Sequence, residues 1–166
     1  VNPTTGLVTG LAAGNAIITY TVSGTGGCAN ATATRTVTVT AAPTAGTLSG
    51  TQEICVNGTS TFASTISGGA WSSSDPAIAT INATTGLVTG LTAGTATITY
   101  TVTGTGGCSN ATATRIVTVT ATPSAGTLSG TQGICVNGTS IFASTISGGA
   151  WSSSTPAIAT VNATTG

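Results

Sequence analysis

The chain repeats itself with a period of eighty residues. Residues 1–80 and 81–160 differ at thirteen positions, most of them exchanges among Thr, Ser, Ala, Val and Ile, and residues 161–166 begin a third copy. Each near-identical unit of this length folds as one structural unit, and arrays of such units build length or multivalent surfaces more often than active sites. We therefore expect a role in which the same surface recurs in every copy.

Charged side chains are almost absent, at 2% of the chain against about 25% in ordinary domains. The four are Arg35, Glu53, Asp75 and Arg115, and there is no histidine. Neither carboxylate recurs one period later, so general acid–base catalysis is not part of the repeated design. Phosphate binding needs several cations on one surface. The composition predicts no enzymatic activity, no cofactor or metal, and no nucleic-acid partner.

The uncharged surface must consist of hydroxyl, amide and backbone groups. No stretch reaches about eighteen apolar residues, so we expect no membrane insertion in this segment. Little net charge opposes association between molecules. We expect the chain to associate with copies of itself, or with a solid or glycan surface.

Every periodic segment predicts a β-strand. Residues 95–102, TATITYTV, and 115–120, RIVTVT, alternate between apolar and hydroxyl side chains. Residues 59–66 and 77–82 are further β-rich runs. Turn signals such as Asn-Gly and Gly-Gly recur every eight to twelve residues, a spacing typical of an all-β sandwich. Each repeat has one Trp and one Tyr, and we expect Trp71 and Tyr100 in its core.

Residues 68–102, GGAWSSSDPAIATINATTGLVTGLTAGTATITYTV, resemble the bacterial immunoglobulin-like domain of group 2, found in invasin- and intimin-type adhesins. The resemblance implies tandem immunoglobulin-like β-sandwich domains, with 42–121 as a complete repeat. Residues 1–41 are then the C-terminal half of the preceding repeat and 122–166 the N-terminal half of the next. The cysteine-containing variant resembles repeats of giant surface proteins from gliding Gram-negative bacteria. It implies an extracellular rod that holds a binding tip away from the cell surface.

Two cysteines per repeat indicate an oxidising exterior compartment. Their spacing does not match a metal site. We predict a Cys55–Cys108 disulfide, which would stabilise the domain by about 4 kcal/mol, with Cys28 and Cys135 pairing with neighbouring repeats. An alternative stays open, because a standard sandwich separates the two positions by roughly 25 Å, beyond the reach of a disulfide. The bond would then join neighbours, as in Cys28–Cys55, or separate chains.

Four residues are candidates for self-association. They are the outward Thr118 and Thr120 of the last strand, and the loop residues Gly106 and Gly107. The Asn-x-Ser/Thr motifs are interpreted as turns, with glycosylation as the alternative. Regular threonine rows also occur in ice-binding proteins, but the twist of a sandwich disrupts a flat lattice.

These observations favour a non-catalytic shaft of an extracellular filament or giant adhesin. The alternative is a repeated module whose loops grip glycans or a host receptor, with avidity from repetition. Isolated repeats that bind sugars or cells would support the module, and inert repeats that polymerise would support the shaft.

Overall fold

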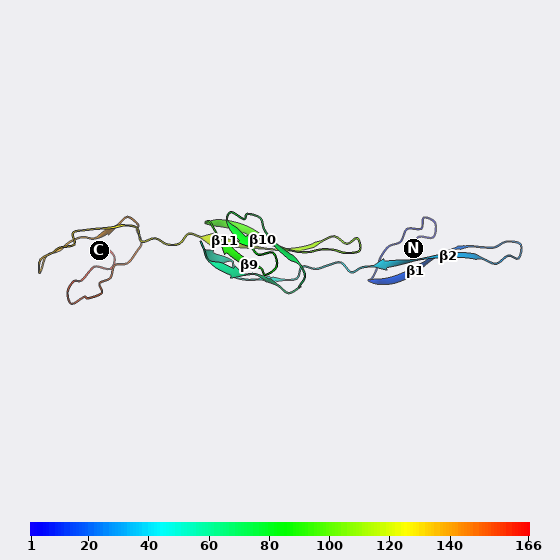
Figure 1. Cartoon of the computed structure of the whole chain (residues 1–166), viewed down its shortest axis with the longest axis horizontal. Helices are drawn as coiled ribbons and strands as arrows, with labels where there is room; N and C mark the ends of the chain where they lie inside the picture. The colour runs from blue at the N-terminus through cyan, green and yellow to red at the C-terminus, as the bar shows by residue number, and fades with distance from the viewer. The chain divides into compact units, whose positions relative to one another are not determined.

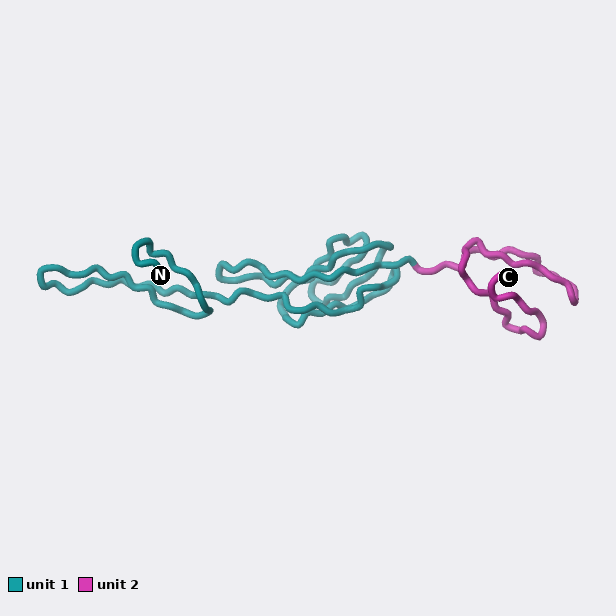
Figure 2. The backbone as a smooth tube through the Cα atoms, turned by 180° about the vertical axis from the view of Figure 1, so that it is seen from behind, with its two compact units in different colours: residues 1–121 teal, residues 122–166 magenta.

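The structure, a computed structural model, describes all residues from 1 to 166. All its regular elements are β-strands, which confirms the predicted all-β fold class. The chain divides into two compact units, 1–121 and 122–166 (Figure 2). Residues 1–41 belong to the same unit as 42–121, so the predicted boundary at residues 41 and 42 stays a prediction.

The first part of the chain is a long antiparallel hairpin (Figure 1). Strand β1 (Gly14–Val22) pairs with β2 (Ala31–Val39) along its whole length. Its apolar side chains are largely exposed, Tyr20 at 72% for example. This hairpin corresponds, one period earlier, to the two longest strands of the complete repeat.

The complete repeat, 42–121, forms two layers of strands. The first layer is a four-stranded sheet in the order β4 (Glu53–Cys55), β11 (Ala111–Thr120), β10 (Gly94–Val102), β7 (Ala70–Ser73). The second contains β5 (Thr59–Thr61), β9 (Leu87–Gly90) and β8 (Ala79–Ile81). A short pair, β3 (Leu48–Ser49) with β6 (Ala63–Ser64), completes the domain. All pairs are antiparallel except β4 with β11.

The predicted alternation is confirmed in the two long strands. In β10 the side chains of Ala96, Ile98 and Tyr100 are buried between threonines, and in β11 Val117 and Val119 are buried. This is the period of two that a half-buried strand requires. The hydroxyl rows of both strands lie on the opposite face.

The run predicted as one strand over residues 59–66 is divided in two. Strand β5 pairs with β9, whereas β6 pairs with β3. The division falls at Phe62, whose backbone N–H donates to the Gly86 carbonyl and whose ring is 1% exposed. The chain changes partner here because this aromatic ring is inserted into the core.

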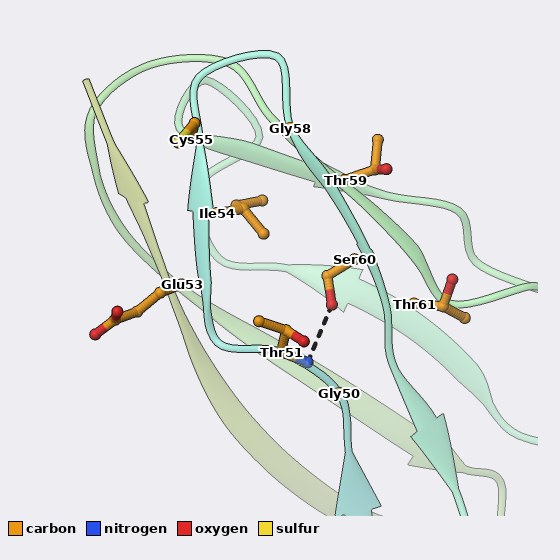
Figure 3. A pocket seen from close by; sticks show the side chains of 9 residues that line it. All are labelled: Gly50, Thr51, Glu53, Ile54, Cys55, Gly58, Thr59, Ser60 and Thr61. Carbon is orange, nitrogen blue, oxygen red and sulfur yellow. Dashed lines mark hydrogen bonds between the residues drawn. The ribbon is translucent and has the colours of Figure 1, made fainter. Parts of the chain in front are cut away.

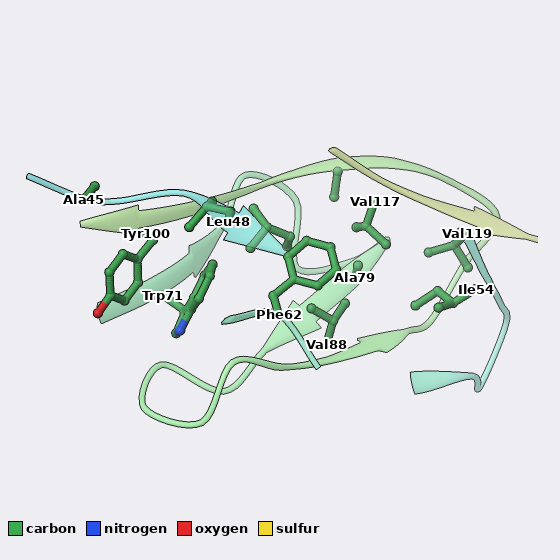
Figure 4. Packing of buried hydrophobic residues seen from close by; sticks show 12 residues of the cluster. Ala45, Leu48, Ile54, Phe62, Trp71, Ala79, Val88, Tyr100, Val117 and Val119 are labelled. Carbon is green, nitrogen blue, oxygen red and sulfur yellow. The ribbon is translucent and has the colours of Figure 1, made fainter. Parts of the chain in front are cut away.

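The core lies between the two layers (Figure 4). The Trp71 and Tyr100 rings are tilted at 45° to each other with their centroids 4.6 Å apart, and Phe62 meets Trp71 edge-on at 6.3 Å. Such aromatic pairs add about 0.5–1.5 kcal/mol beyond the area they bury. The buried residues are Ala45, Leu48, Ile54, Phe62, Trp71, Ala79, Val88, Ala96, Ile98, Tyr100, Val117 and Val119. None of the thirteen positions that differ between the copies is among them.

The second unit, 122–166, contains only the short antiparallel pair β12 (Leu128–Ser129) and β13 (Ala143–Ser144). These strands correspond to β3 and β6 one period earlier. Leu128 is 62% exposed, whereas its equivalent Leu48 is 9% exposed. The same residue is therefore buried only where β10 and β11 complete the sandwich.

Candidate functional site at the two ends of the domain

Strand β4 places Cys55 at one end of the domain. Its parallel pairing sets Cys55 opposite Thr120, the last residue of β11. The next residue, Val56, donates its backbone N–H to the Thr120 carbonyl at 2.9 Å. Asn57 then turns the chain with a left-handed backbone (φ 65°), which asparagine tolerates. Cys55 is exposed, with its sulfur 3.9 Å from the Thr120 hydroxyl oxygen.

The hairpin loop between β10 and β11 places Cys108 at the opposite end. Asn110 fixes this loop by accepting a hydrogen bond from the Gly104 N–H at 3.0 Å. The Cys108 thiol donates to the backbone carbonyl of Thr40 at 3.6 Å and lies 3.9 Å from the carbonyl oxygen of Ala41. The loop thus contacts the segment through which the chain enters the domain.

The predicted Cys55–Cys108 disulfide is corrected by this arrangement. All four cysteines are free thiols, and the two in the complete repeat lie at opposite ends of β11. Ten residues of extended strand span about 30 Å, whereas bridged cysteines need Cα atoms within about 7 Å. Within one domain the two sulfurs cannot meet, so the expected stabilisation does not apply.

The candidate self-association residues are divided between the two ends. Thr118 is half-buried, with β4 and β10 on either side, and donates its backbone N–H to the Gln52 carbonyl at 2.7 Å. Thr120 is exposed, and its hydroxyl donates to the Ile54 carbonyl at 3.3 Å. Gly106 and Gly107 are exposed in the Cys108 loop. A contact that uses all four would therefore involve both ends of a domain.

A shallow groove of about 480 Å³ lies beside β4 and β5 (Figure 3). The Ser60 hydroxyl crosses it to accept a hydrogen bond from the Thr51 backbone N–H at 3.1 Å. Glu53 is its one charged residue and is Gly133 in the next copy. Its lining residues are Gly50, Thr51, Glu53, Ile54, Cys55, Gly58, Thr59, Ser60 and Thr61. Nowhere in the chain do three His, Cys, Asp or Glu residues come together as a metal site.

A larger hollow of about 790 Å³ in residues 122–166 belongs to the core rather than to a binding site. Phe142 and Trp151 line it. Their equivalents one period earlier, Phe62 and Trp71, are covered in the complete repeat, where Tyr100 lies against Trp71. The hollow is therefore the part of the core that the remaining strands of the sandwich cover in the complete repeat.

Arg115 has a structural role that the sequence pattern alone does not reveal. Its side chain is on the same face of β11 as Val117 and Val119, and its Nη1 donates to the Leu48 carbonyl at 3.1 Å. The guanidinium carbon lies 6.0 Å from the centroid of the Phe62 ring, a distance at which cation and ring attract. One sequence signal does point to this role. Arginine occurs at both equivalent positions, 35 and 115, whereas no other charged residue is repeated one period later.

The Asn-x-Ser/Thr motifs occupy turns, as interpreted from the sequence. Asn82 caps its turn by accepting from the backbone N–H groups of Thr84 and Thr85, and Asn57 and Asn137 have left-handed backbones. Glycosylation stays an alternative, because these contacts leave the side-chain amide nitrogens free.

Residues 33–114 match the family model described as the bacterial Ig-like domain (group 2). This segment includes most of the complete repeat and the last part of the preceding one. No curated protein matches the chain. The structure has no helix that is long and apolar enough to cross a membrane.

Proposed function

Since residues 33–114 belong to the bacterial immunoglobulin-like domain family of group 2, we propose that the chain is part of the shaft of an extracellular bacterial filament or giant adhesin. Its repeats are structural and non-catalytic. In this role each domain adds length and presents the same neutral surface again. A binding tip, where one exists, would lie elsewhere in the protein.

The observation that carries this proposal is the placement of the entry and exit of the domain. The chain enters beside the Cys108 loop, at Thr40 and Ala41. It leaves after Thr120, at the far end of β11. Because these points lie about 30 Å apart along a strand, tandem copies gain length with every repeat. Domains whose entry and exit lay side by side would gain far less.

The pattern of differences between the copies supports the same role. All twelve buried core residues are identical in the two copies, so both copies can build the same packing arrangement. The charged groups Glu53 and Asp75 vary, as Gly133 and Thr155 show. A repeated catalytic site would require the opposite pattern, with polar groups retained.

The alternative, a glycan-gripping module, has weaker support. The groove beside β4 offers hydroxyls, but the aromatic residues of the complete repeat, Phe62, Trp71 and Tyr100, are buried. Sugar rings usually stack on exposed aromatic faces, which supply much of the apolar contact in a binding site. The groove provides no such face.

Electron microscopy of the protein released from the bacterial surface tests the proposal. We expect filaments or thin rods whose length scales with the number of repeats. Compact particles of constant size would contradict it. A glycan array probed with the same material tests the alternative, since specific sugar binding by the repeats would favour the module.

A further inference from the structure

We propose that successive domains are joined by a disulfide between the Cys55 position of one domain and the Cys108 position of the next. The inference rests on the proposed tandem shaft. It assigns the cysteines to the junctions between domains, in a defined register.

The first step is the contact of Cys108 with the entering chain. Its thiol lies 3.6 Å from the Thr40 carbonyl oxygen, just beyond the end of β2. Gly106 in the same loop approaches so closely that a Cβ there would collide with the Thr40 hydroxyl. The Cys108 loop is thus seated on the last residues of the preceding repeat.

The end of the domain repeats the surroundings of its beginning. Thr120 is the equivalent of Thr40 one period later, and the β10–β11 and β1–β2 hairpins have the same register, Gly94 opposite Val119 and Gly14 opposite Val39. At Thr120 the neighbouring thiol is Cys55, 3.9 Å from the hydroxyl oxygen.

In a tandem array, the threonine at each junction therefore has two cysteine sulfurs beside it. One sulfur, at the Cys55 position, contacts the hydroxyl of that threonine. The other, at the Cys108 position of the following domain, contacts its carbonyl. Both thiols therefore contact the same residue, which is the placement that a disulfide across the junction requires. For Cys55 and Cys108 themselves, the partners fall outside residues 1–166.

The oxidation balances as an ordinary thiol–disulfide exchange. A thiolate of the junction attacks the disulfide of a periplasmic or surface oxidoreductase and forms a mixed disulfide. The second junction thiolate then displaces the enzyme. Two thiols lose two electrons and two protons, and the oxidoreductase leaves as a dithiol. Cys55 is exposed and Cys108 half-buried, so both are accessible before the junction closes.

The register has a mechanical consequence. By the repeat, Cys135 holds the Cys55 position of the following domain, and 28 residues of chain, 108–135, connect it to Cys108. With a disulfide at each end, this segment spans two domains in at most roughly 100 Å. If the rest of either domain unfolds, the shaft gains almost no length, because this segment still connects the two disulfides. The shaft is therefore inextensible while oxidised.

Peptide mapping of the native surface protein tests the connectivity. After alkylation and denaturation, trypsin cuts at Arg35 and Arg115 and releases 36–115, which carries both Cys55 and Cys108. We expect a ladder of cross-linked fragments that collapses to eighty-residue pieces on reduction. Fragments that are already separate without reduction, or fully alkylated thiols, would overturn the proposal. Rods seen by microscopy would then still support the shaft.

Two controls distinguish the proposed pairing of cysteines from the alternative pairings. In the 166-residue chain alone we expect four reactive thiols after oxidation, whereas Cys28–Cys55 and Cys108–Cys135 bonds would leave none and refute the register. Bonds between chains would raise the mass of the denatured, unreduced and uncut protein, which the proposed register leaves unchanged.

A matched pair of glycine variants tests the seating of the loop. Gly106 and Gly107 both have left-handed backbones (φ 61° and 84°), but only a Cβ at Gly106 meets Thr40. In the multi-repeat protein we expect Gly106→Ala to slow cross-linking at least several-fold relative to Gly107→Ala. Equal rates for the two variants would contradict the predicted seating of the loop and with it the proposal.

Discussion

At the scale of single residues, the stability of the domain depends on its few aromatic side chains. Trp71 is packed between Phe62 and Tyr100. Truncation to Trp71→Ala removes both contacts and leaves a cavity, at a cost of about 3–5 kcal/mol. We expect the complete domain to unfold at a much lower denaturant concentration. Trp151→Ala, in a residue that is half-exposed, is the control and should leave this transition unchanged.

The hydroxyl of Tyr100 provides a second prediction at this scale. It donates to the Ile66 carbonyl and accepts from the Gly69 N–H, both at 2.8 Å. Tyr100→Phe removes these bonds from a buried site and should destabilise the domain by about 1–2 kcal/mol. Tyr20→Phe is the matched control, since Tyr20 is the exposed equivalent. Equal melting temperatures for the two variants would show that the hydroxyl is not needed.

At the scale of elements, β11 provides both the interior of the sheet and the predicted contact surface. We expect Thr118→Lys with Thr120→Lys to keep the domain folded, because the ammonium group introduced at Thr118 faces the Glu53 carboxylate across the strands. The added charge should weaken self-association measured by sedimentation. Thr84→Lys, at an exposed position in the turn between β8 and β9, is the control. Unchanged association of the double variant would show that these two threonines are not part of the contact.

Strand pairing also predicts the order of proteolysis. Arg35 is exposed on β2, which pairs only with β1, whereas Arg115 lies within a four-stranded sheet and bonds to Leu48. Cleavage requires local opening of the strand. Trypsin should therefore cut the folded 166-residue chain at Arg35 well before Arg115, as mass spectrometry of the fragments would show. Simultaneous cleavage would mean that β11 opens as easily as the hairpin.

At the scale of the whole molecule, the near-absence of charge determines how copies interact. With 2% charged residues there is little electrostatic repulsion to screen. We expect the chain to self-associate, with a sedimentation coefficient that rises with protein concentration and hardly changes between low and high salt. Monodisperse monomers at high concentration would contradict the filament proposal and favour an isolated stalk.

The amino-acid sequence by itself determined the features that depend on local pattern. Alternation over residues 95–102 is enough to define β10 and its buried face, because the side chains of a strand alternate with a period of two. Strand alternation, together with turn signals every eight to twelve residues, predicted the all-β fold. Trp71 and Tyr100 lie in the core because a domain with so few large apolar residues has little else to bury.

Only the tertiary structure decided what depends on pairing between distant segments. A standard sandwich already implied that Cys55 and Cys108 are far apart, but only the parallel pairing of β4 with β11 decided this against the predicted bond within one domain. Phe62 and Arg115 turn inward because strands far away in the sequence create their surroundings. Leu48 and Leu128 share a local sequence but differ in exposure. Burial is a property of the partners that cover a residue, and those partners are chosen by long-range packing.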